Sequence, residues 1–147
     1  MQHYLIPHYF YRFHYLLMRD FKPACAEEYK LNRTQGKTLM VLRCKGSRTM
    51  SELVCDLNIE KGSMTTVVDH LISRKLALRK RDQKDRRRVI IDLTASGRAL
   101  AEALVNEKNN HILKKLDQLG EERKESVNDF LTILRESIDI WETHSES

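Results

Sequence analysis

The sequence predicts a mainly α-helical α+β fold, in which long helices flank a small central region with one β-hairpin. Three observations support this prediction. Apolar residues recur at helical spacing over much of the 147-residue chain. The segment RDQKDRRRVIIDLT, residues 81–94, joins a charged loop to the two-residue alternation of a strand. The composition, 41% hydrophobic and 32% charged, is that of a globular protein.

Residues 4–29 form the first predicted helical region. Apolar residues from Phe10 to Phe21 follow a period near 3.6, and Pro7 and Pro23 limit the regular part. Tyrosines and histidines fill the positions between them, so no clearly polar face remains. A helix that is apolar or aromatic nearly all round is usually buried. We therefore expect this region to pack against a second chain.

Two short helices joined by a tight turn are predicted in the middle of the chain. A short helix over residues 34–44 precedes them, and a capping-box pattern of Thr49 and Glu52 starts the first of the two. The segment Asn58–Glu60 separates it from a second helix that begins at Lys61. The second helix has one apolar stripe, formed by Met64, Val67, Val68, Leu71 and Ile72. Small polar residues on its other side are typical of a helix-turn-helix.

A hairpin is predicted directly after this second helix. Residues 76–80 form its first strand, residues 82–87 its loop and residues 89–93 its second strand, in which Val89, Ile91 and Leu93 share one face. A hairpin that follows a recognition helix is a wing.

Charge is distributed unevenly along the chain. The formal net charge is +5, but residues 74–88 carry nine cations and two aspartates, which makes this segment +7. Residues 117–147 carry nine acids and three cations, or −6. The hairpin is therefore expected to attract a polyanion, and the end of the chain to avoid one.

Two long helices are predicted after the hairpin. Thr94 caps the first, over residues 95–119, and Gly120 ends it. The second carries an apolar set that comprises Val127, Phe130, Leu131, Leu134, Ile138 and Trp141. Helices this apolar do not stand alone in water, so we expect a dimer.

In the order of its elements and in several motifs, the chain resembles the MarR family of bacterial winged-helix transcription regulators. The wing motif at Asp82–Arg87, DQKDRR, runs into LTASG at Leu93–Gly97, and this combination carries the resemblance. Further matches lie in the helix-turn-helix, at Ser51–Leu53, Asn58–Lys61, Val68–Leu71 and Arg74–Leu76. The pattern covers about residues 34–143, and the N-terminal helix matches in position only.

The resemblance implies a homodimer with interlocked N- and C-terminal helices and two winged helices that bind a pseudo-palindromic operator. The helix Lys61–Lys75 then enters the major groove and the wing reaches the minor groove. Such regulators usually repress, and many release DNA when a small anion, a phenolic compound, a metal or an oxidant acts near the junction of the two regions. The chain departs from the family pattern in three places: Gly62 replaces a frequent Ser, Thr66 a frequent Arg and Lys75 a frequent Gly.

We assign DNA contacts to the second helix and the wing. Base edges are read by Ser63, Thr65 and Thr66, with His70 further along the helix. Lys61 and Arg74 are assigned to phosphates, and Arg86 and Arg87 to the minor groove, where a guanidinium fits better than an ammonium. The remaining assigned contacts are Gly62, Lys84 and Arg88. The resemblance implies that Asp85 braces the wing through a charge-assisted pair with Arg87. Asp69 does not favour phosphate, and we expect it to pair with Arg74 or a wing arginine.

The effector is less well defined by the sequence. Tyr9, Tyr11 and His14 are candidates for a pocket that takes an aromatic ligand, and a tyrosine-rich dimer interface is the alternative. Cys25 is a candidate for a peroxide-sensing thiol, against the simpler interpretation that it is a packed, reduced thiol. No metal-ligand spacing and no catalytic motif occurs. We therefore expect no cofactor, no metal and no enzymatic activity.

The predicted organisation is an N-terminal dimerisation helix at residues 1–33, a winged helix-turn-helix DNA-binding domain at 34–94 and C-terminal dimerisation helices at 95–147. No apolar run reaches the length of a membrane span, and the N-terminus lacks the order of a signal peptide, which favours the cytoplasm. The predicted function is a dimeric, sequence-specific, ligand-responsive repressor. The alternative is a winged-helix module that binds a protein partner and does not read DNA, and Gly62 and Thr66 leave this alternative open.

Overall fold

The computed structural model describes residues 6–144. Its elements follow the order α1 (Ile6–Met18), α2 (Ala24–Glu28), α3 (Arg33–Lys45), β1 (Arg48–Thr49), α4 (Met50–Leu57), α5 (Lys61–Ser73), β2 (Ala77–Arg81), β3 (Val89–Leu93), α6 (Ala95–Asp117) and α7 (Glu121–His144). Contacts divide the chain into two compact units. One is Phe21–Asn109, and the other combines Met1–Asp20 with Asn110–Ser147.

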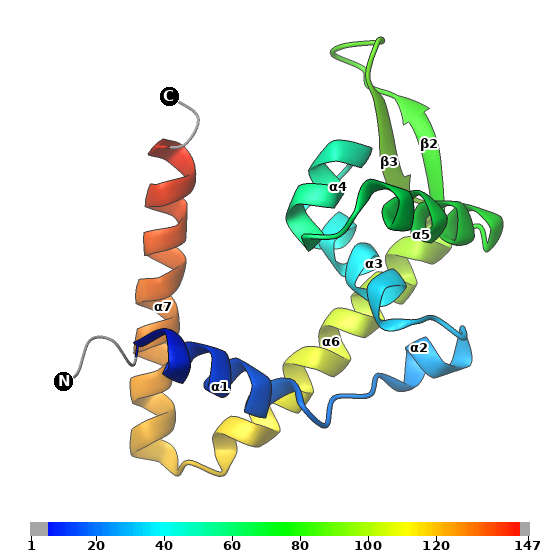
Figure 1. Cartoon of the computed structure of the whole chain (residues 1–147). Helices are drawn as coiled ribbons and strands as arrows, with labels where there is room; N and C mark the ends of the chain where they lie inside the picture. Colours follow the sequence, from blue (N-terminus) through cyan, green and yellow to red (C-terminus); the bar gives the residue numbers. More distant parts are fainter. Residues whose placement is uncertain (1–5, 145–147) are drawn as a thin grey trace. The chain divides into compact units, whose positions relative to one another are not determined.

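The unit Phe21–Asn109 is a winged helix-turn-helix. Helices α3, α4 and α5 pack together, and the hairpin of β2 and β3 extends from them (Figure 1). Its core is apolar and includes Leu39, Leu42, Leu53, Met64, Val68, Leu71, Leu76, Ile91 and Leu104. The mainly α-helical α+β fold with a small wing, predicted from the sequence, is confirmed.

Local capping explains where the helices of this unit begin. The Thr49 side chain accepts a hydrogen bond from the Glu52 N–H, and the Glu52 carboxylate accepts one from the Thr49 N–H, so the predicted capping box is confirmed. Asn58 then ends α4 in the left-handed region, at φ 50° and ψ 52°, which Asn tolerates better than most residues. At the start of α6, the Thr94 hydroxyl accepts a hydrogen bond from the Gly97 N–H at 3.0 Å, as expected of a cap.

The sheet contains a strand that the sequence did not predict. The strand order is β1-β3-β2, and both pairings are antiparallel. Strand β1 is only two residues long, with Arg48 opposite Ile91 and Thr49 opposite Ile90. Such a short strand leaves no periodic pattern in the sequence. It matters for the site because it ties the wing to the start of α4.

The N-terminal region is helical, as predicted over residues 4–29, but it forms two helices on either side of Pro23, which was expected to limit the regular part. Helix α1 ends at Met18, and a separate five-residue helix, α2, begins after Pro23. Proline cannot donate a backbone hydrogen bond within a helix, so the two helices are separate. Residues 4 and 5 of the predicted helix lie outside the described residues.

The second unit joins α1 to the end of α6 and to α7. The Phe10 and Phe130 rings lie 5.9 Å apart, and the His111 ring is 2.8 Å from the Leu17 carbonyl. Many large apolar side chains of this unit remain exposed in the single chain. On α1 they are Tyr9, Phe10, Tyr11, Phe13, Tyr15 and Leu16, and on α7 they are Phe130, Leu131, Ile133, Ile138, Ile140 and Trp141.

Candidate nucleic-acid interface

Helix α5 has one buried face and one exposed face. Met64, Val67, Val68 and Leu71 are buried in the core. Because residues three and four apart share a face of a helix, burial of this set directs the remaining residues to solvent. The exposed set contains Lys61, Gly62, Ser63, Thr65, Thr66 and Asp69. The residues assigned to base readout in the first two turns are therefore exposed together.

The two threonine hydroxyls on this face donate within the helix. Thr65 Oγ1 donates to the Lys61 carbonyl at 3.0 Å, and Thr66 Oγ1 donates to the Gly62 carbonyl at 3.3 Å. Each hydroxyl oxygen still has lone pairs, so each threonine offers an acceptor and a methyl group to solvent. These groups match the amino groups of adenine and cytosine and the methyl group of thymine in the major groove.

The N-terminal turn of α5 is open to an anion. Glu60 is the N-cap residue, and its side chain makes no capping hydrogen bond. A Cβ atom at Gly62 would meet nothing within 4 Å, so packing inside the chain does not require glycine there. The first N–H groups of a helix have no partner in the helix itself and attract phosphate oxygens. Gly62 leaves space for a phosphate to approach them.

His70 and Arg74, the two residues further along α5 that were predicted to contact DNA, differ in burial or bonding from the exposed residues of the first two turns. His70 is half-buried, and its Nε2 atom is buried without a hydrogen-bond partner among the described residues. In this conformation Nε2 is not available to a base edge. Arg74 Nη2 donates to the Tyr29 carbonyl at 2.9 Å, although the Arg74 side chain is exposed.

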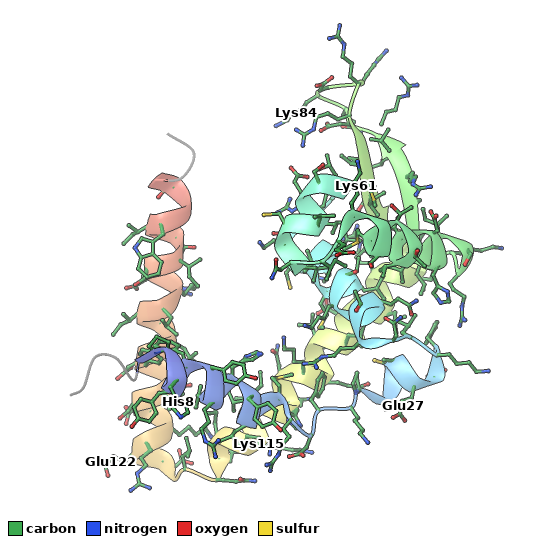
Figure 2. All side chains as sticks on the ribbon, in the orientation of Figure 1. His8, Glu27, Lys61, Lys84, Lys115 and Glu122 are labelled. Carbon is green, nitrogen blue, oxygen red and sulfur yellow. The ribbon has the colours of Figure 1, made fainter. Side chains whose placement is uncertain are left out.

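The wing projects a short loop of exposed cations. Lys84 lies at the far end of the hairpin, and Lys61 lies on α5 (Figure 2). Arg86 and Arg87 are also exposed, and neither makes a side-chain ion pair within the described part of the chain. Arg86 also lines an open hollow of about 540 Å³, together with Arg81, Asp82 and Gln83. The loop therefore presents guanidinium groups to solvent without a neutralising partner, as a contact to DNA phosphates or a narrow minor groove requires.

The two aspartates of the loop shape its backbone. Asp82 accepts a hydrogen bond from the Lys84 N–H at 2.9 Å, and Asp85 accepts one from the Arg87 N–H at 3.0 Å. The Asp85 carboxylate thus bonds to the backbone of Arg87 and not to its guanidinium, which corrects the predicted side-chain pair. Bonds of this kind stabilise tight turns, so Asp85 braces the wing through the main chain.

Arg88 is held more firmly than the prediction assumed. Its Nη2 atom lies 3.0 Å from Glu52 Oε1, in an ion pair that connects the wing to α4. The backbone N–H of Thr49 lowers the pKa of Glu52, and the Thr49 hydroxyl and Arg88 lower it further, while burial opposes them. The pattern near Arg88 predicted a DNA contact, but it gave no signal for this pairing.

Asp69 pairs with an arginine of the wing, which was one of its two expected partners; the other was Arg74. Its Oδ1 atom lies 2.7 Å from Nη2 of Arg79 on β2, and Arg74 bonds to Tyr29 instead. Arg88 and Arg79 therefore connect the two strands of the hairpin to α4 and α5, respectively.

Cys25 is poorly suited to sensing peroxide. Burial raises the pKa of its thiol, and hydrogen bonding and charge from Glu107 raise it further, to about 11. The reactive form of cysteine is the thiolate, which a raised pKa disfavours. Glu107 also accepts hydrogen bonds from the Ala24 and Cys25 N–H groups, at 2.6 and 3.1 Å. The simpler interpretation, a packed and reduced thiol, fits these contacts better.

The effector candidates lie on α1, apart from the wing in sequence. Tyr9 is 59% exposed and Tyr11 is 74% exposed in the single chain, and His14 is exposed as well. Their assignment to a pocket stays a prediction. Among the described residues, no group of three or more His, Cys, Asp and Glu side chains is arranged to hold a metal ion. Over the same residues, none of the helices combines the length and apolarity that a membrane crossing requires.

A helix-turn-helix with an exposed polar helix, followed by a hairpin with a cationic tip, defines a winged-helix DNA-binding protein. Comparison with known proteins gives the same class. The model of the MarR family matches residues 31–89. Over this segment the chain is similar to the MarR family, and it is a DNA-binding transcriptional regulator rather than a module that does not read DNA.

Three individual similarities support this placement. The HTH-type transcriptional regulator YwhA of Bacillus subtilis is 29% identical over 104 residues, which cover 71% of this chain and 73% of YwhA. A mutant of MepR from Staphylococcus aureus, bound to an oligodeoxyribonucleotide, is similar in structure with a TM-score of 0.59 at 26% identity, over 88% of this chain and 96% of MepR. NadR in complex with 4-hydroxyphenylacetate has a TM-score of 0.66 at 25% identity, over 85% of this chain and 88% of NadR.

Proposed function

We propose that this protein is a homodimeric repressor that binds a pseudo-palindromic operator and releases it when a small effector binds. The observation that carries the DNA-binding part is the exposed face of α5 beside a wing loop whose arginines lack side-chain ion pairs among the described residues. Residues 34–94 are the DNA-binding domain in this proposal. Residues 1–33 and 95–147 form the dimer.

Recognition combines two kinds of contact. Lys61 and Lys84 bind phosphates, which gives affinity that falls steeply with salt. Arg86 and Arg87 enter the minor groove, where a guanidinium suits the narrow groove of A·T-rich sequence. Ser63, Thr65 and Thr66 read base edges. Because Thr66 stands where the family often has Arg, this protein lacks a bidentate guanine contact worth about 1–3 kcal/mol, so shape and backbone contacts contribute more.

Dimerisation is supported by the exposed apolar side chains of α1 and α7. Exposed apolar patches of this extent mark protein interfaces. A second copy that packs against these helices would also surround Tyr9, Tyr11 and His14. The complex of NadR with 4-hydroxyphenylacetate supports a small aromatic acid as the effector class. We assign no catalytic role to the protein and infer that it acts in the cytoplasm, where operator DNA lies.

Selection of genomic fragments by the purified protein tests this function. We expect a small set of fragments that share a pseudo-palindrome to be enriched at moderate salt. Repeating the selection with 4-hydroxyphenylacetate and other aromatic acids tests the effector, because an effector should reduce recovery of the same fragments. Failure to enrich any sequence would contradict the proposed function, and unchanged recovery with every acid would contradict the effector class.

A further inference from the structure

Two ion pairs connect the wing to the helix-turn-helix. Arg79, on β2, pairs with Asp69 of α5 at 2.7 Å, and Arg88, next to β3, pairs with Glu52 of α4 at 3.0 Å. Each strand of the hairpin is thus tied to a different helix. The hydrogen bonds that the structure describes for the loop, residues 82–87, all lie within the hairpin, so these bonds do not fix the loop to the helices.

Asp69 has an unusual position for a DNA-facing surface. It is the only acidic residue in α5, and it lies on the exposed face with Thr66. A carboxylate near a phosphate backbone opposes binding. Its pair with Arg79 contributes little to stability, because the two side chains remain 55% and 46% exposed. Charge and stability therefore give no reason for an acidic residue at this position, whereas a structural link to the wing does.

The link acts at the place where the hairpin leaves the core. Ala77 and Leu93 face each other at the base of the hairpin, and both are buried. Arg79 is the next residue of β2 on the same side of the strand, opposite buried Ile91, and it is exposed. From Arg79 outward, no residue of β2 is buried. An ion pair at this point is placed to restrict the angle at which the rest of the hairpin projects from α5.

We propose that Asp69 is a positioning residue for DNA binding. Through Arg79 it holds the wing at a fixed orientation to α5, so that the wing arginines and the α5 surface contact DNA at the same time. The inference rests on the proposed function, because it assigns a role within that DNA contact. Glu52 serves the same purpose on the other strand through Arg88.

Charge and position predict opposite results for Asp69→Asn, which makes the test sharp. Loss of a negative charge alone should tighten DNA binding. Loss of the tether should weaken it, by about twofold to fivefold, which is the range for an exposed ion pair. Glu60→Gln is the matched control, because Glu60 is exposed at the start of α5 and makes no side-chain ion pair among the described residues. We expect this control to bind as tightly as the wild type or more tightly.

The measurement is fluorescence anisotropy with a duplex enriched by the wild-type protein, at one salt concentration. Asp69→Glu should restore most of the binding that Asp69→Asn loses, and thermal unfolding should show that all variants are folded. In an Arg79→Gln background Asp69→Asn should no longer lower the affinity for the duplex, because the ion pair is already absent.

A second measurement reads the tether without DNA. The ¹⁵N heteronuclear NOE of the amides of residues 82–87 should fall in Asp69→Asn and stay unchanged in Glu60→Gln. If the wild type binds its duplex and Asp69→Asn binds it equally well or more tightly, the inference is overturned. If the wild type enriches no duplex, the proposed function fails first and the inference falls with it.

Discussion

At the scale of single residues, Lys75 shows how backbone geometry explains a departure from the family pattern. The family often has Gly at this position, and here Lys75 has a φ of 57°, in the left-handed region. A side chain in this region is strained because Cβ approaches the neighbouring carbonyl. The Lys75 carbonyl accepts hydrogen bonds from Thr94 and Ser96, which helps to maintain the conformation.

Lys75→Gly should therefore stabilise the protein. Relief of strain exceeds the extra flexibility of glycine in the unfolded chain, and we expect a gain of about 0.5–1 kcal/mol in the free energy of unfolding. Lys37→Gly is the control, since Lys37 is an exposed lysine inside α3 and should lose about 1 kcal/mol. Urea unfolding at equal protein concentration measures both. A loss of stability in both variants would contradict this account of Lys75.

Arg88 and His70 mark the limit of prediction at this scale. Both were assigned to DNA from residue type and position near the wing and on α5. The structure pairs Arg88 with Glu52, 36 positions away in sequence, and buries the Nε2 atom of His70. Such contacts depend on how distant segments pack, which a local pattern does not contain. The exposure of Ser63 and Thr65 was predictable because helical spacing alone determines it.

At the scale of elements, the junction of the wing with α6 depends on one close approach. The family resemblance rested partly on LTASG, and the structure gives a physical reason for its glycine. A Cβ atom at Gly97 would lie 1.7 Å from the Leu76 carbonyl oxygen. The same carbonyl accepts a hydrogen bond from the Thr94 N–H at 3.1 Å, so the hairpin and the start of α6 meet there.

Gly97→Ala should destabilise the protein strongly. The clash involves backbone atoms and cannot be relieved by a change of rotamer, and we expect a loss on the order of 3 kcal/mol. Gly36→Ala is the matched control: Gly36 is inside α3, where an added Cβ meets nothing within 4 Å. It should gain about 0.5–1 kcal/mol from higher helix propensity. Equal melting temperatures of the two variants would show that the close approach at Gly97 is not as described.

Elements with a strong repeating pattern were predictable, and those set by single contacts were not. The three helices around the helix-turn-helix and both wing strands follow from apolar spacing and capping residues. Strand β1 has two residues and exists because β3 provides a partner. In the N-terminal region Pro23 was expected to limit the regular part, and it does stand between two helices; the end of α1 at Met18 and the short helix α2 were not predicted.

At the scale of the whole molecule, the apolar surface of α7 is the feature that a single chain leaves unexplained. Ile133 is 59% exposed and lies one helical turn after the exposed Phe130. Ile133→Glu should convert the proposed dimer to monomers, because a carboxylate in an apolar interface loses its hydration. Asn128→Glu, on an already polar position of α7, is the control and should remain dimeric. Light scattering after size-exclusion chromatography gives the masses. A monomeric wild-type protein would contradict the proposed assembly.

The dimer also determines how strongly the wing affects DNA binding, because each protomer contributes one Arg87. Loss of a cation that neutralises phosphate charge, whether it bonds to a phosphate or lies in the minor groove, reduces the slope of log K against log salt concentration by about one per cation. Arg87→Ala should therefore lower the magnitude of the slope by about two for a dimer. Arg135→Ala removes an exposed arginine of α7 instead and serves as the control.

The salt dependence of binding to the duplex enriched by the wild-type protein tests the central claim most directly. Anisotropy titrations of the wild type, Arg87→Ala and Arg135→Ala over a range of salt concentrations provide the three slopes. We predict a steep slope for the wild type, the same slope for Arg135→Ala and a clearly shallower one, with weaker binding, for Arg87→Ala. Equal slopes and equal affinities for the two variants would contradict the assignment of the wing to DNA.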